Sequence, residues 1–395
     1  MTARFLLGNA PFLFVGFTGS GFIFTINPMR ILQISSAKNF GGGEKHLVDL
    51  VKGLQKRGHE IFLAAPNESP ILEKLEIFPE ENILPVKIKN SADVLAATKI
   101  AKFIKRNKIE IVHAHIAKDY LPASVAVRFA KQAKLILTRH VLFPMKRTQR
   151  FALSNVSKVI AVSSGVAASL ERTFPKEKIV KVPNGIETEK WTNADKEKLF
   201  REFRFLHDIP FDVPLVGTIG ELKRLKGQQD FIFAANEIAK KFPEARFVSV
   251  GADNSFKKDF RRDLKRLVKV FNLEDKFLFL NWVEDTAPLL SAIDIFVSAS
   301  HSESFGLAIL EAMASGKAIV ATETEGAKEL IENEKSGKLA QVKEPLKLAE
   351  KIENFLSDEK MRETFGANAQ KKAGENFSLE KMIERTEKVY ESVLS

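Results

Sequence analysis

The chain has 395 residues, enough for two domains of ordinary size, and its 45% hydrophobic and 28% charged residues are typical of a globular protein. It contains no cysteine, which excludes disulfides, zinc sites with cysteine ligands and cysteine nucleophiles. The net charge of +11 favours an anionic partner such as a nucleotide, a membrane lipid or a nucleic acid without choosing among them.

The N-terminal segment differs from the rest of the chain. Residues 5–26 are apolar, rich in phenylalanine and close to the length of a membrane span, but glycine, asparagine and proline residues interrupt them. Met29 opens a strand-like segment with a basic tip, which is typical of a protein start. We therefore predict that residues 1–28 are a hydrophobic extension added by a mis-assigned start codon. The alternative is an N-terminal membrane anchor.

From Met29 onward, short β-branched segments alternate with amphipathic segments, which predicts a repeated strand–helix pattern. In the first half we predict strands at residues 31–35, 60–65, 110–113, 134–138 and 158–163. We predict a glycine turn at 40–44 and helices at 45–57, 93–107 and 120–130. Such alternation is typical of a doubly wound parallel sheet.

A second series of the same kind begins at Pro214. Its predicted strands lie at 215–219, 245–250, 276–280, 293–298 and 318–322, and its predicted helices at 228–241, 256–271 and 305–314. We therefore expect an α/β protein with Rossmann-like domains at 29–187 and 213–375, a polar connector at 188–212, and a last helix, 376–395, that packs back on the first domain. Ligands in such sheets bind beyond the C-terminal strand ends, which we expect to face each other across a cleft.

Two carboxylates flank the start of the helix predicted after the strand at 293–298. Glu303 lies on the loop and Glu311 lies more than one turn into the helix. Backbone N–H groups near Phe305, Gly306 and Leu307 lack helical partners and form a seat for phosphate. The two carboxylates can then contact different parts of one elongated ligand with phosphate in its middle, and a nucleotide sugar has that layout.

A glycine-framed loop after the strand at 215–219 carries Lys223, Arg224 and Lys226 ahead of a helix. Cations at a helix N-terminus are unfavourable for the helix itself, so an anion is their natural partner. The glycine turn of the first half, with Gly42 and Gly43, allows a similarly close approach of backbone to a ligand.

Histidines follow two of the predicted strands. Because side chains alternate along a strand, His113 is directed into the sheet while His115 emerges at the strand tip. His140 repeats the arrangement one strand later and is the weaker candidate. No carboxylate or cysteine set completes a metal site with them, so we predict no metal.

In this order, these segments resemble the retaining family 4 glycosyltransferases, which have the GT-B fold. The resemblance runs from about Met29 to the C-terminus and is most specific in the Glu303–Glu311 block and the Lys226 loop. It implies a GT-B fold with two Rossmann-like domains. It also implies transfer of a sugar, with retention, from a nucleotide-diphosphate sugar to an acceptor hydroxyl, without a metal or other cofactor.

The resemblance assigns roles to the candidates. The catalytic residues would be Glu303, which would face the donor sugar, His115, which would face the sugar or the acceptor, and Lys226, which would contact the diphosphate. The donor-binding set would be Gly42, Gly43, Arg224, Phe305, Gly306, Leu307, Glu311 and Gly326. The family has an arginine where this chain has Glu221, and we expect Arg224 or Lys223 to replace it.

Two basic runs bear on location and partners. The run on helix 256–271 is interpreted as the solvated face of a core-packed helix. Arg139, Lys146, Arg147 and Arg150 surround the apolar residues 142–145, which suits an anionic membrane surface. We expect a cytoplasmic enzyme, with peripheral attachment to the inner face of the cytoplasmic membrane as an option. The acceptor would be a glycan or a lipid-linked acceptor of the cell envelope, such as lipopolysaccharide; no nucleic-acid motif is present.

Two other functions stay open from the sequence. A nucleotide-sugar epimerase on the same architecture would release free sugar without an acceptor. A non-catalytic nucleotide-sugar or glycan-binding protein is motivated by Glu221, and it would bind a donor without turnover. A dehydrogenase is disfavoured because no complete Gly-x-Gly-x-x-Gly follows a strand.

Overall fold

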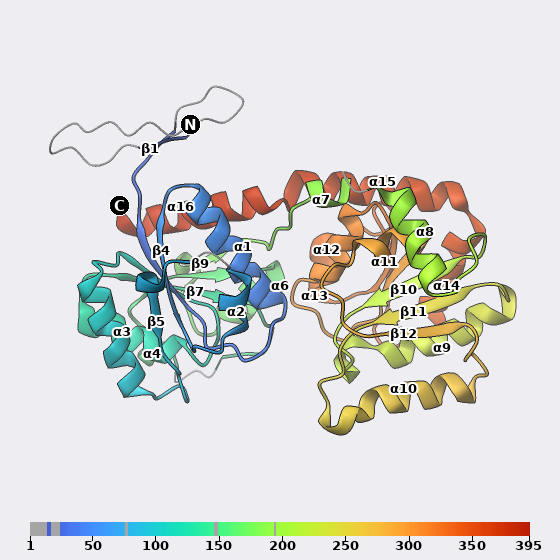
Figure 1. Cartoon of the computed structure of the whole chain (residues 1–395), viewed down its shortest axis with the longest axis horizontal. Coiled ribbons are helices and arrows are strands. Elements are labelled where there is room, and N and C mark those ends of the chain that lie inside the picture. The colour runs from blue at the N-terminus through green and yellow to red at the C-terminus, as the bar shows by residue number, and fades with distance from the viewer. Residues whose placement is uncertain (1–13, 17–23, 76–77, 146–148, 193–194) are drawn as a thin grey trace. The chain divides into compact units, whose positions relative to one another are not determined.

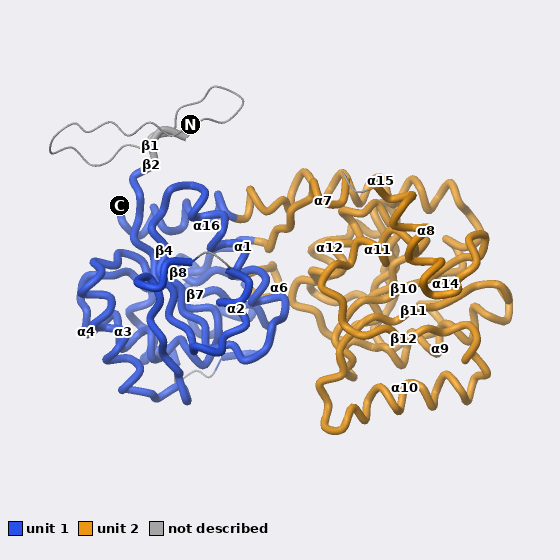
Figure 2. The backbone as a smooth tube through the Cα atoms, viewed as in Figure 1, with its two compact units in different colours: residues 1–161, 167–182, 383–395 blue, residues 162–166, 183–382 orange. Residues whose placement is uncertain are grey.

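The computed structural model describes residues 14–16, 24–75, 78–145, 149–192 and 195–395 (Figure 1). The chain divides into two compact units (Figure 2). Unit 1 takes the described residues up to 161 together with 167–182 and 383–395, and unit 2 takes 162–166 and 183–382. The predicted N-terminal extension falls mostly outside the described residues, apart from the antiparallel pair β1 (Phe14–Gly16) and β2 (Phe24–Ile26). In the part of the chain that is described, no helix is both long and apolar enough to cross a membrane.

Unit 1 is built on a sheet in which every strand pairing is parallel. Its described strands are β3 (Arg30–Ile34), β4 (Glu60–Ala65), β5 (Ile83–Pro85), β6 (Ile111–Ala114), β7 (Lys134–Arg139), β8 (Val156–Ala161) and β9 (Ile179–Lys181). They lie in the order β5-β4-β3-β6-β7-β8-β9. The direction of winding reverses between β3 and β6, and ligands of open α/β sheets bind at such a reversal.

Apolar side chains fix these elements on both sides of the sheet. Ile31, Leu32 and Ile34 of β3 are fully buried, as expected for a parallel strand covered by helices on both faces. The helices between β3 and β9 are α1 (Gly42–Lys56), α2 (Pro70–Lys74), η1 (Glu80–Asn82), α3 (Val94–Arg106), α4 (Tyr120–Ala130), α5 (Gln149–Ala152), α6 (Ser164–Leu170) and η2 (Lys176–Lys178). Helix α3 begins where the Asp93 carboxylate accepts a hydrogen bond from the Ala96 N–H at 3.0 Å.

Unit 2 repeats the same plan. Its strands are β10 (Leu215–Ile219), β11 (Arg246–Val250), β12 (Phe277–Leu280), β13 (Ile295–Ser298), β14 (Ala318–Thr322) and β15 (Lys338–Ala340). All pair in parallel in the order β12-β11-β10-β13-β14-β15, so the reversal lies between β10 and β13. The predicted doubly wound parallel architecture is confirmed for both halves of the chain.

The helices of unit 2 cover this second sheet. They are α7 (Glu189–Thr192), α8 (Lys196–Leu206), η3 (Arg224–Lys226), α9 (Gln228–Lys241), η4 (Phe256–Lys258), α10 (Asp259–Val270), α11 (Ala287–Ala292), α12 (Leu307–Ala314), α13 (Glu325–Leu330), α14 (Pro345–Ser357) and α15 (Glu359–Asn376). Phe231, Phe247, Phe277 and Phe355 are among the residues of its core. The predicted helix at 256–271 is shorter than expected, because Lys257 and Lys258 adopt left-handed backbone that separates η4 from α10.

The last helix, α16 (Leu379–Leu394), contributes its residues from 383 onward to unit 1. The Tyr390 hydroxyl lies 2.7 Å from His113 Nδ1, and Glu387 pairs with Arg57 at 2.6 Å. A Cβ on Gly53 of α1 would overlap the side chain of Ile383, so these helices pack closely only because residue 53 is glycine. Unit 1 is therefore completed by the C-terminal end of the chain.

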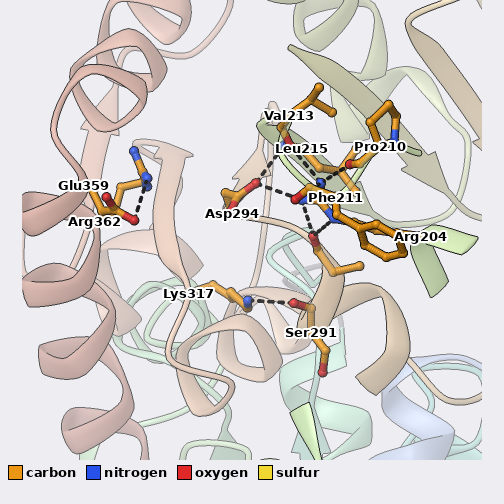
Figure 3. A network of polar contacts seen from close by, with 11 residues as sticks. Arg204, Pro210, Phe211, Val213, Leu215, Ser291, Asp294, Lys317, Glu359 and Arg362 are labelled. Atoms are coloured by element: carbon orange, nitrogen blue, oxygen red, sulfur yellow. Dashed lines mark hydrogen bonds and ion pairs between the residues drawn. The ribbon is translucent and has the colours of Figure 1, made fainter. Parts of the chain in front are cut away.

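The segment predicted as a polar connector contains helices for which no prediction was made. They are α7 and α8, and Arg204 of α8, of which only 1% is exposed, bonds to the segments just ahead of β10 and β13. The Arg204 guanidinium donates to the carbonyl oxygens of Pro210, Val213 and Ala292 at 2.7, 2.7 and 2.9 Å (Figure 3). It also contacts Asp294 at 3.1 Å. The sequence did not predict that Arg204 is buried, because its segment contains other basic residues that are exposed.

Lys317 lies in the same region of unit 2 (Figure 3). Its ammonium donates to the carbonyl oxygen of Ser291 at 3.1 Å. Burial lowers the pKa of Lys317 to about 8, although Asp294 favours the charged form. Below that pH the folded protein carries a poorly solvated charge.

We predict that Lys317→Met stabilises the protein at pH 7. The folded pKa lies below the 10.5 of the free side chain, so wild-type stability rises as the pH increases from about 8 to about 10.5. The shift corresponds to about 3 kcal/mol and the lost hydrogen bond offsets about 1, which leaves a gain of about 2 kcal/mol at pH 7. Chemical denaturation at pH 7 and at pH 10 measures the difference, which should shrink at the higher pH. The exposed Lys360→Met is the control, and an equal gain in both variants would contradict the assignment.

Candidate active site

The basic loop after β10 is held against the end of β13 by a glycine. Gly227 has a φ of 66°, and a Cβ there would overlap the carbonyl oxygen of Ala299. The His301 N–H donates to the carbonyl oxygen of Leu225 at 2.8 Å, which ties the same two segments together. The loop and the C-terminal end of β13 are thus one local structure at the reversal point of the sheet.

Lys226 and Glu303 meet in this structure. The Lys226 ammonium donates to the Glu303 carboxylate, and the two side chains are 26% and 17% exposed. The Glu303 carbonyl oxygen also accepts a hydrogen bond from the Gly326 N–H at 2.8 Å. Three segments that are distant in sequence therefore converge on one partly buried ion pair, which brings together two of the predicted catalytic residues.

Gly326 has a clear packing role. A Cβ at this position would lie 2.5 Å from the carbonyl oxygen of Phe305 and 2.7 Å from its nitrogen. Gly326 thus allows the start of α13 to press on the backbone that follows Glu303. Its predicted contact with the donor stays a prediction.

The helix start predicted at Phe305 lies two residues later. Gly306 caps α12 with a φ of 99°, and Leu307 is the first helical residue. Phe305 is 3% exposed, and its ring lies 5.9 Å from that of Phe377, so its side chain belongs to the core. The first amides of α12 lie directly after this turn, where a helix has unpaired N–H groups and a partial positive charge.

Glu311 lies one turn further along α12 and is only partly buried. The Thr286 hydroxyl, just ahead of α11, donates to its carboxylate at 3.0 Å. Glu303 and Glu311 therefore lie on either side of the start of α12, each held by a different partner.

Glu221, which replaces the arginine of the family, is neutralised locally. Its carboxylate accepts hydrogen bonds from Lys223 and, at 3.2 Å, from Asn254, and despite its partial burial these bonds lower its pKa. The Lys223 ammonium is thereby paired with Glu221. Among the described residues the Arg224 guanidinium has no hydrogen-bond or ion-pair partner, and the side chain is exposed. Of the two expected replacements, Arg224 is the cation that remains available.

His115 follows β6 at the reversal point of unit 1. Its Nε2 lies 2.8 Å from Gln33 Oε1, and the Gln33 amide donates to the Tyr390 hydroxyl. His113 is enclosed between the Tyr390 and Thr138 hydroxyls, each at 2.7 Å, and so has the inward orientation predicted for it. Burial lowers the pKa of His113 and of His115 well below the usual value, and neighbouring imidazoles lower both further.

Two further histidines lie beside His115. The ring centroids of His46 and His140 are each 5.9 Å from that of His115. Burial likewise lowers the pKa of His140 well below its usual value, and His46 adds to the effect. His140 also contacts Gly43, where a Cβ would lie 3.7 Å from its ring, an ordinary packing distance. Gly42 and Gly43 begin α1, three residues before the predicted start, and Gly42 is exposed.

Sequence reasoning missed four residues of these two sites. Gln33 was detectable as a lone polar residue within an apolar strand. His46, Thr286 and Asn254 gave no such signal, because each lies in a segment whose pattern is explained by its helix or loop alone. Their partners become evident only when the strands are placed side by side.

The comparisons with known families cover both halves of the chain. Residues 40–190 match the family described as Glycosyltransferase Family 4, and residues 200–372 match the family described as Glycosyl transferases group 1. The chain belongs to the family 4 glycosyltransferases. It is therefore a glycosyltransferase with the GT-B fold, as the sequence resemblance implied.

Three curated relatives of this glycosyltransferase match along most of their length. N-acetyl-alpha-D-glucosaminyl L-malate synthase of Bacillus anthracis is 28% identical and covers 92% of this chain and 97% of its own. UDP-Gal:alpha-D-GlcNAc-diphosphoundecaprenol alpha-1,3-galactosyltransferase of Escherichia coli is 25% identical, and the match covers 87% of this chain and 95% of that protein. The lipopolysaccharide core biosynthesis glycosyltransferase LpsE of Rhizobium meliloti is 24% identical, and the match covers 85% of this chain and 91% of that protein.

Two solved structures share the fold. A glycosyltransferase of Rickettsia africae superposes with a TM-score of 0.84 at 24% identity, covering 94% of this chain and all of its own. Anabaena HepE, solved in complex with UDP-glucose, superposes with a TM-score of 0.81 at 23% identity, covering 92% and 100%.

We predict that Gly227→Ala destabilises unit 2, because the new methyl group overlaps the Ala299 carbonyl at a backbone angle that favours glycine. The expected loss is about 2–4 kcal/mol in the free energy of unfolding, measured by urea denaturation. Gly374→Ala is the matched control, because a Cβ at Gly374 in α15 meets nothing within 4 Å. It should stabilise by about 0.5–1 kcal/mol. Equal effects in the two variants would refute the packing argument.

Proposed function

We propose that this glycosyltransferase moves a sugar, with retention of anomeric configuration, from a nucleotide-diphosphate donor to a hydroxyl of a cell-envelope glycan or lipid-linked acceptor. The observation that carries the proposal is the Lys226–Glu303 pair, which lies beside the start of α12 at the reversal point between β10 and β13. That place combines a cation, an acid and unpaired helix amides.

The donor would lie along this edge of unit 2. Its diphosphate would contact Lys226, Arg224 and the first amides of α12, which supply positive charge without a metal ion. Glu303 would contact the sugar and Glu311 the ribose hydroxyls, as the family resemblance implies. HepE, which shares the fold, has been solved with UDP-glucose, which supports a nucleotide sugar as donor.

Departure of the diphosphate is the step that these groups favour. Negative charge develops on the leaving phosphate as the glycosidic bond breaks, and Lys226, Arg224 and the helix start are placed to stabilise it. We infer a front-face reaction in which the acceptor hydroxyl attacks from the side of the leaving phosphate, and this phosphate takes the hydroxyl proton. Glu303 is then a sugar contact held by Lys226 rather than a covalent nucleophile.

His115 would contribute from unit 1. Since Gln33 Oε1 accepts from its Nε2, the neutral ring has an unprotonated Nδ1 that can accept a hydrogen bond from a hydroxyl of the sugar or acceptor. Gly42 and Gly43 at the start of α1 would lie near the donor phosphates, as the resemblance implies.

The acceptor is proposed from relatives and from one surface loop. LpsE is named for lipopolysaccharide core biosynthesis, and the galactosyltransferase relative is named for a diphosphoundecaprenol-linked substrate. Phe143 and Phe151 are 68% and 83% exposed. Arg139 differs from the prediction, because it is buried and donates to the Phe143 carbonyl; Lys146 and Arg147 lie outside the described residues. We infer peripheral attachment to an anionic surface on the cytoplasmic side of the membrane.

We predict that the full chain cosediments with vesicles containing anionic phospholipid, because Phe143 and Phe151 can enter the headgroup region while nearby cations contact the headgroups. A Phe143→Ser and Phe151→Ser double variant should lose most of this binding. Exposed Phe256, which lies in unit 2, supplies the control Phe256→Ser. Equal binding to neutral vesicles would contradict the attachment.

The family places the chain among transferases, so neither the epimerase nor the non-catalytic binding protein is retained. Analysis of the products formed from a nucleotide sugar and a lipid-linked acceptor distinguishes a transferase from these two alternatives. A transferase gives glycosylated acceptor with inherited anomeric configuration. Free epimerised sugar, or donor binding without turnover on any acceptor tested, would contradict the proposal.

We predict that Glu303→Gln lowers kcat by about a hundredfold or more, because the lost charge frees Lys226 and weakens the contact with the sugar. Glu311→Ala should instead raise the donor Kd about ten- to a hundredfold, through loss of charge-assisted hydrogen bonds to the ribose. Steady-state kinetics and calorimetry with the nucleotide sugar measure the two effects. Exposed Glu363→Gln on α15 should change neither value, and unchanged kinetics in both site variants would refute the assigned roles.

We predict that Arg224→Gln weakens donor binding more than Lys223→Gln does. Arg224 is available to a phosphate, whereas Lys223 is engaged by Glu221. The expected difference is about tenfold in Kd for the nucleoside diphosphate, because removal of one charge-assisted contact costs about 1.5–3 kcal/mol. Calorimetry with the nucleoside diphosphate measures the Kd of each variant. A larger loss of affinity in Lys223→Gln than in Arg224→Gln would reverse the assignment.

A further inference from the structure

We propose that unit 1 contains a transition-metal site formed by His46, His115 and His140, with Zn²⁺ as its natural probe. The three imidazoles come from α1, from the residue after β6 and from the residue after β7. One ring nitrogen of each lies within 4.8 Å of the ring nitrogens of the other two. His46 and His140 also contact each other, with ring centroids 4.9 Å apart.

Two ring nitrogens of this cluster point to a ligand. His115 Nδ1 and His140 Nε2 are buried, and among the described residues neither has a hydrogen-bond partner. His115 is only 5% exposed. A buried polar atom left without a partner costs about 1–3 kcal/mol, so a bound cation at this place removes a penalty that the folded chain otherwise bears.

The surroundings of His115 favour metal ligation by Nδ1. The Gln33 amide nitrogen donates to the Tyr390 hydroxyl at 3.2 Å, which leaves Gln33 Oε1 to accept from His115 Nε2–H at 2.8 Å. The ring therefore presents the lone pair of Nδ1. A hydrogen bond on the far nitrogen is the usual outer contact of a metal-bound histidine, because it fixes the tautomer and the ring orientation.

The donor set selects the class of metal. Three imidazoles and no carboxylate suit Zn²⁺, Co²⁺, Ni²⁺ or Cu²⁺ rather than Mg²⁺ or Ca²⁺, which prefer oxygen ligands. Zinc–nitrogen bonds of about 2.1 Å place tetrahedral ligand nitrogens about 3.4 Å apart, so a modest side-chain rotation closes the site. Three protein ligands leave the fourth position to water or to a ligand oxygen.

The consequence for catalysis rests on the proposed function. The metal takes the same nitrogen, His115 Nδ1, that would accept a hydrogen bond from the sugar or acceptor. Bound Zn²⁺ and productive substrate therefore exclude each other. The site makes the transferase inhibitable by zinc, while the reaction itself proceeds in metal-free enzyme.

The experiment uses the full chain, purified without a histidine tag and treated with a chelator. Titration calorimetry with ZnCl₂, and Co²⁺ absorption spectroscopy as a second readout, should show about one site per chain. His46→Asn and His140→Asn should each raise the Kd for zinc at least tenfold. His207→Asn, which changes a histidine of unit 2 outside the cluster, is the matched control and should leave the Kd unchanged. Circular dichroism establishes that the variants are folded.

Two results would overturn the site: no heat and no Co²⁺ spectrum with the folded wild type, or zinc binding that survives in the His46→Asn/His140→Asn double variant. Transfer assays then test the consequence, since zinc should inhibit wild type at lower concentration than it inhibits either single variant. Zinc binding without inhibition of transfer would contradict the proposal that zinc and the substrate compete for His115 Nδ1. Lack of transfer in metal-free wild type contradicts the proposed function instead, and the calorimetric result for the site stands apart from it.

Discussion

The close approach of backbone segments at the C-terminal edge of the second sheet is the constraint on which the candidate site depends. Gly227 lies against the Ala299 carbonyl and Gly326 against the Phe305 backbone, with no room for a Cβ at either place. Because the loop after β10 and the start of α13 both press on the segment between β13 and α12, Lys226 reaches Glu303 at the start of α12. A bulkier residue would push these segments apart, and the cation, the acid and the helix amides would no longer lie together.

The edge of the first sheet is held by hydrogen bonds rather than by close backbone packing. Gln33, Tyr390, His113 and Thr138 form a buried polar network, and His115 is joined to it through Gln33. Such a network fixes ring orientation and tautomer because each buried donor must find an acceptor. Since Tyr390 comes from α16, the end of the chain sets the orientation of a histidine at its first Rossmann-like sheet.

The electrostatics of the two edges differ accordingly. In unit 2, Glu221 takes the place of a cation of the family but binds Lys223 and Asn254, so its charge is compensated and Arg224 remains available to an anion. In unit 1, burial and neighbouring imidazoles keep the histidines neutral, which leaves nitrogen lone pairs for a hydroxyl or for a metal ion. One edge thus carries an available cation beside a helix start, which we propose binds a diphosphate, and the other carries neutral imidazoles, which we propose accept hydrogen bonds.

The sequence by itself determined the alternation of strands and helices, the doubly wound class and the candidates Glu303, Glu311 and Lys226. Hydrophobic period, glycine turns and helix starts are local signals that need no knowledge of distant segments. Only the tertiary structure decided that Arg204 of the connector is buried and paired, that Glu221 is paired with Lys223 and Asn254, and that His46 joins His115 and His140. These facts depend on which side chains meet when strands far apart in the chain lie side by side, and local sequence patterns carry no information about such meetings.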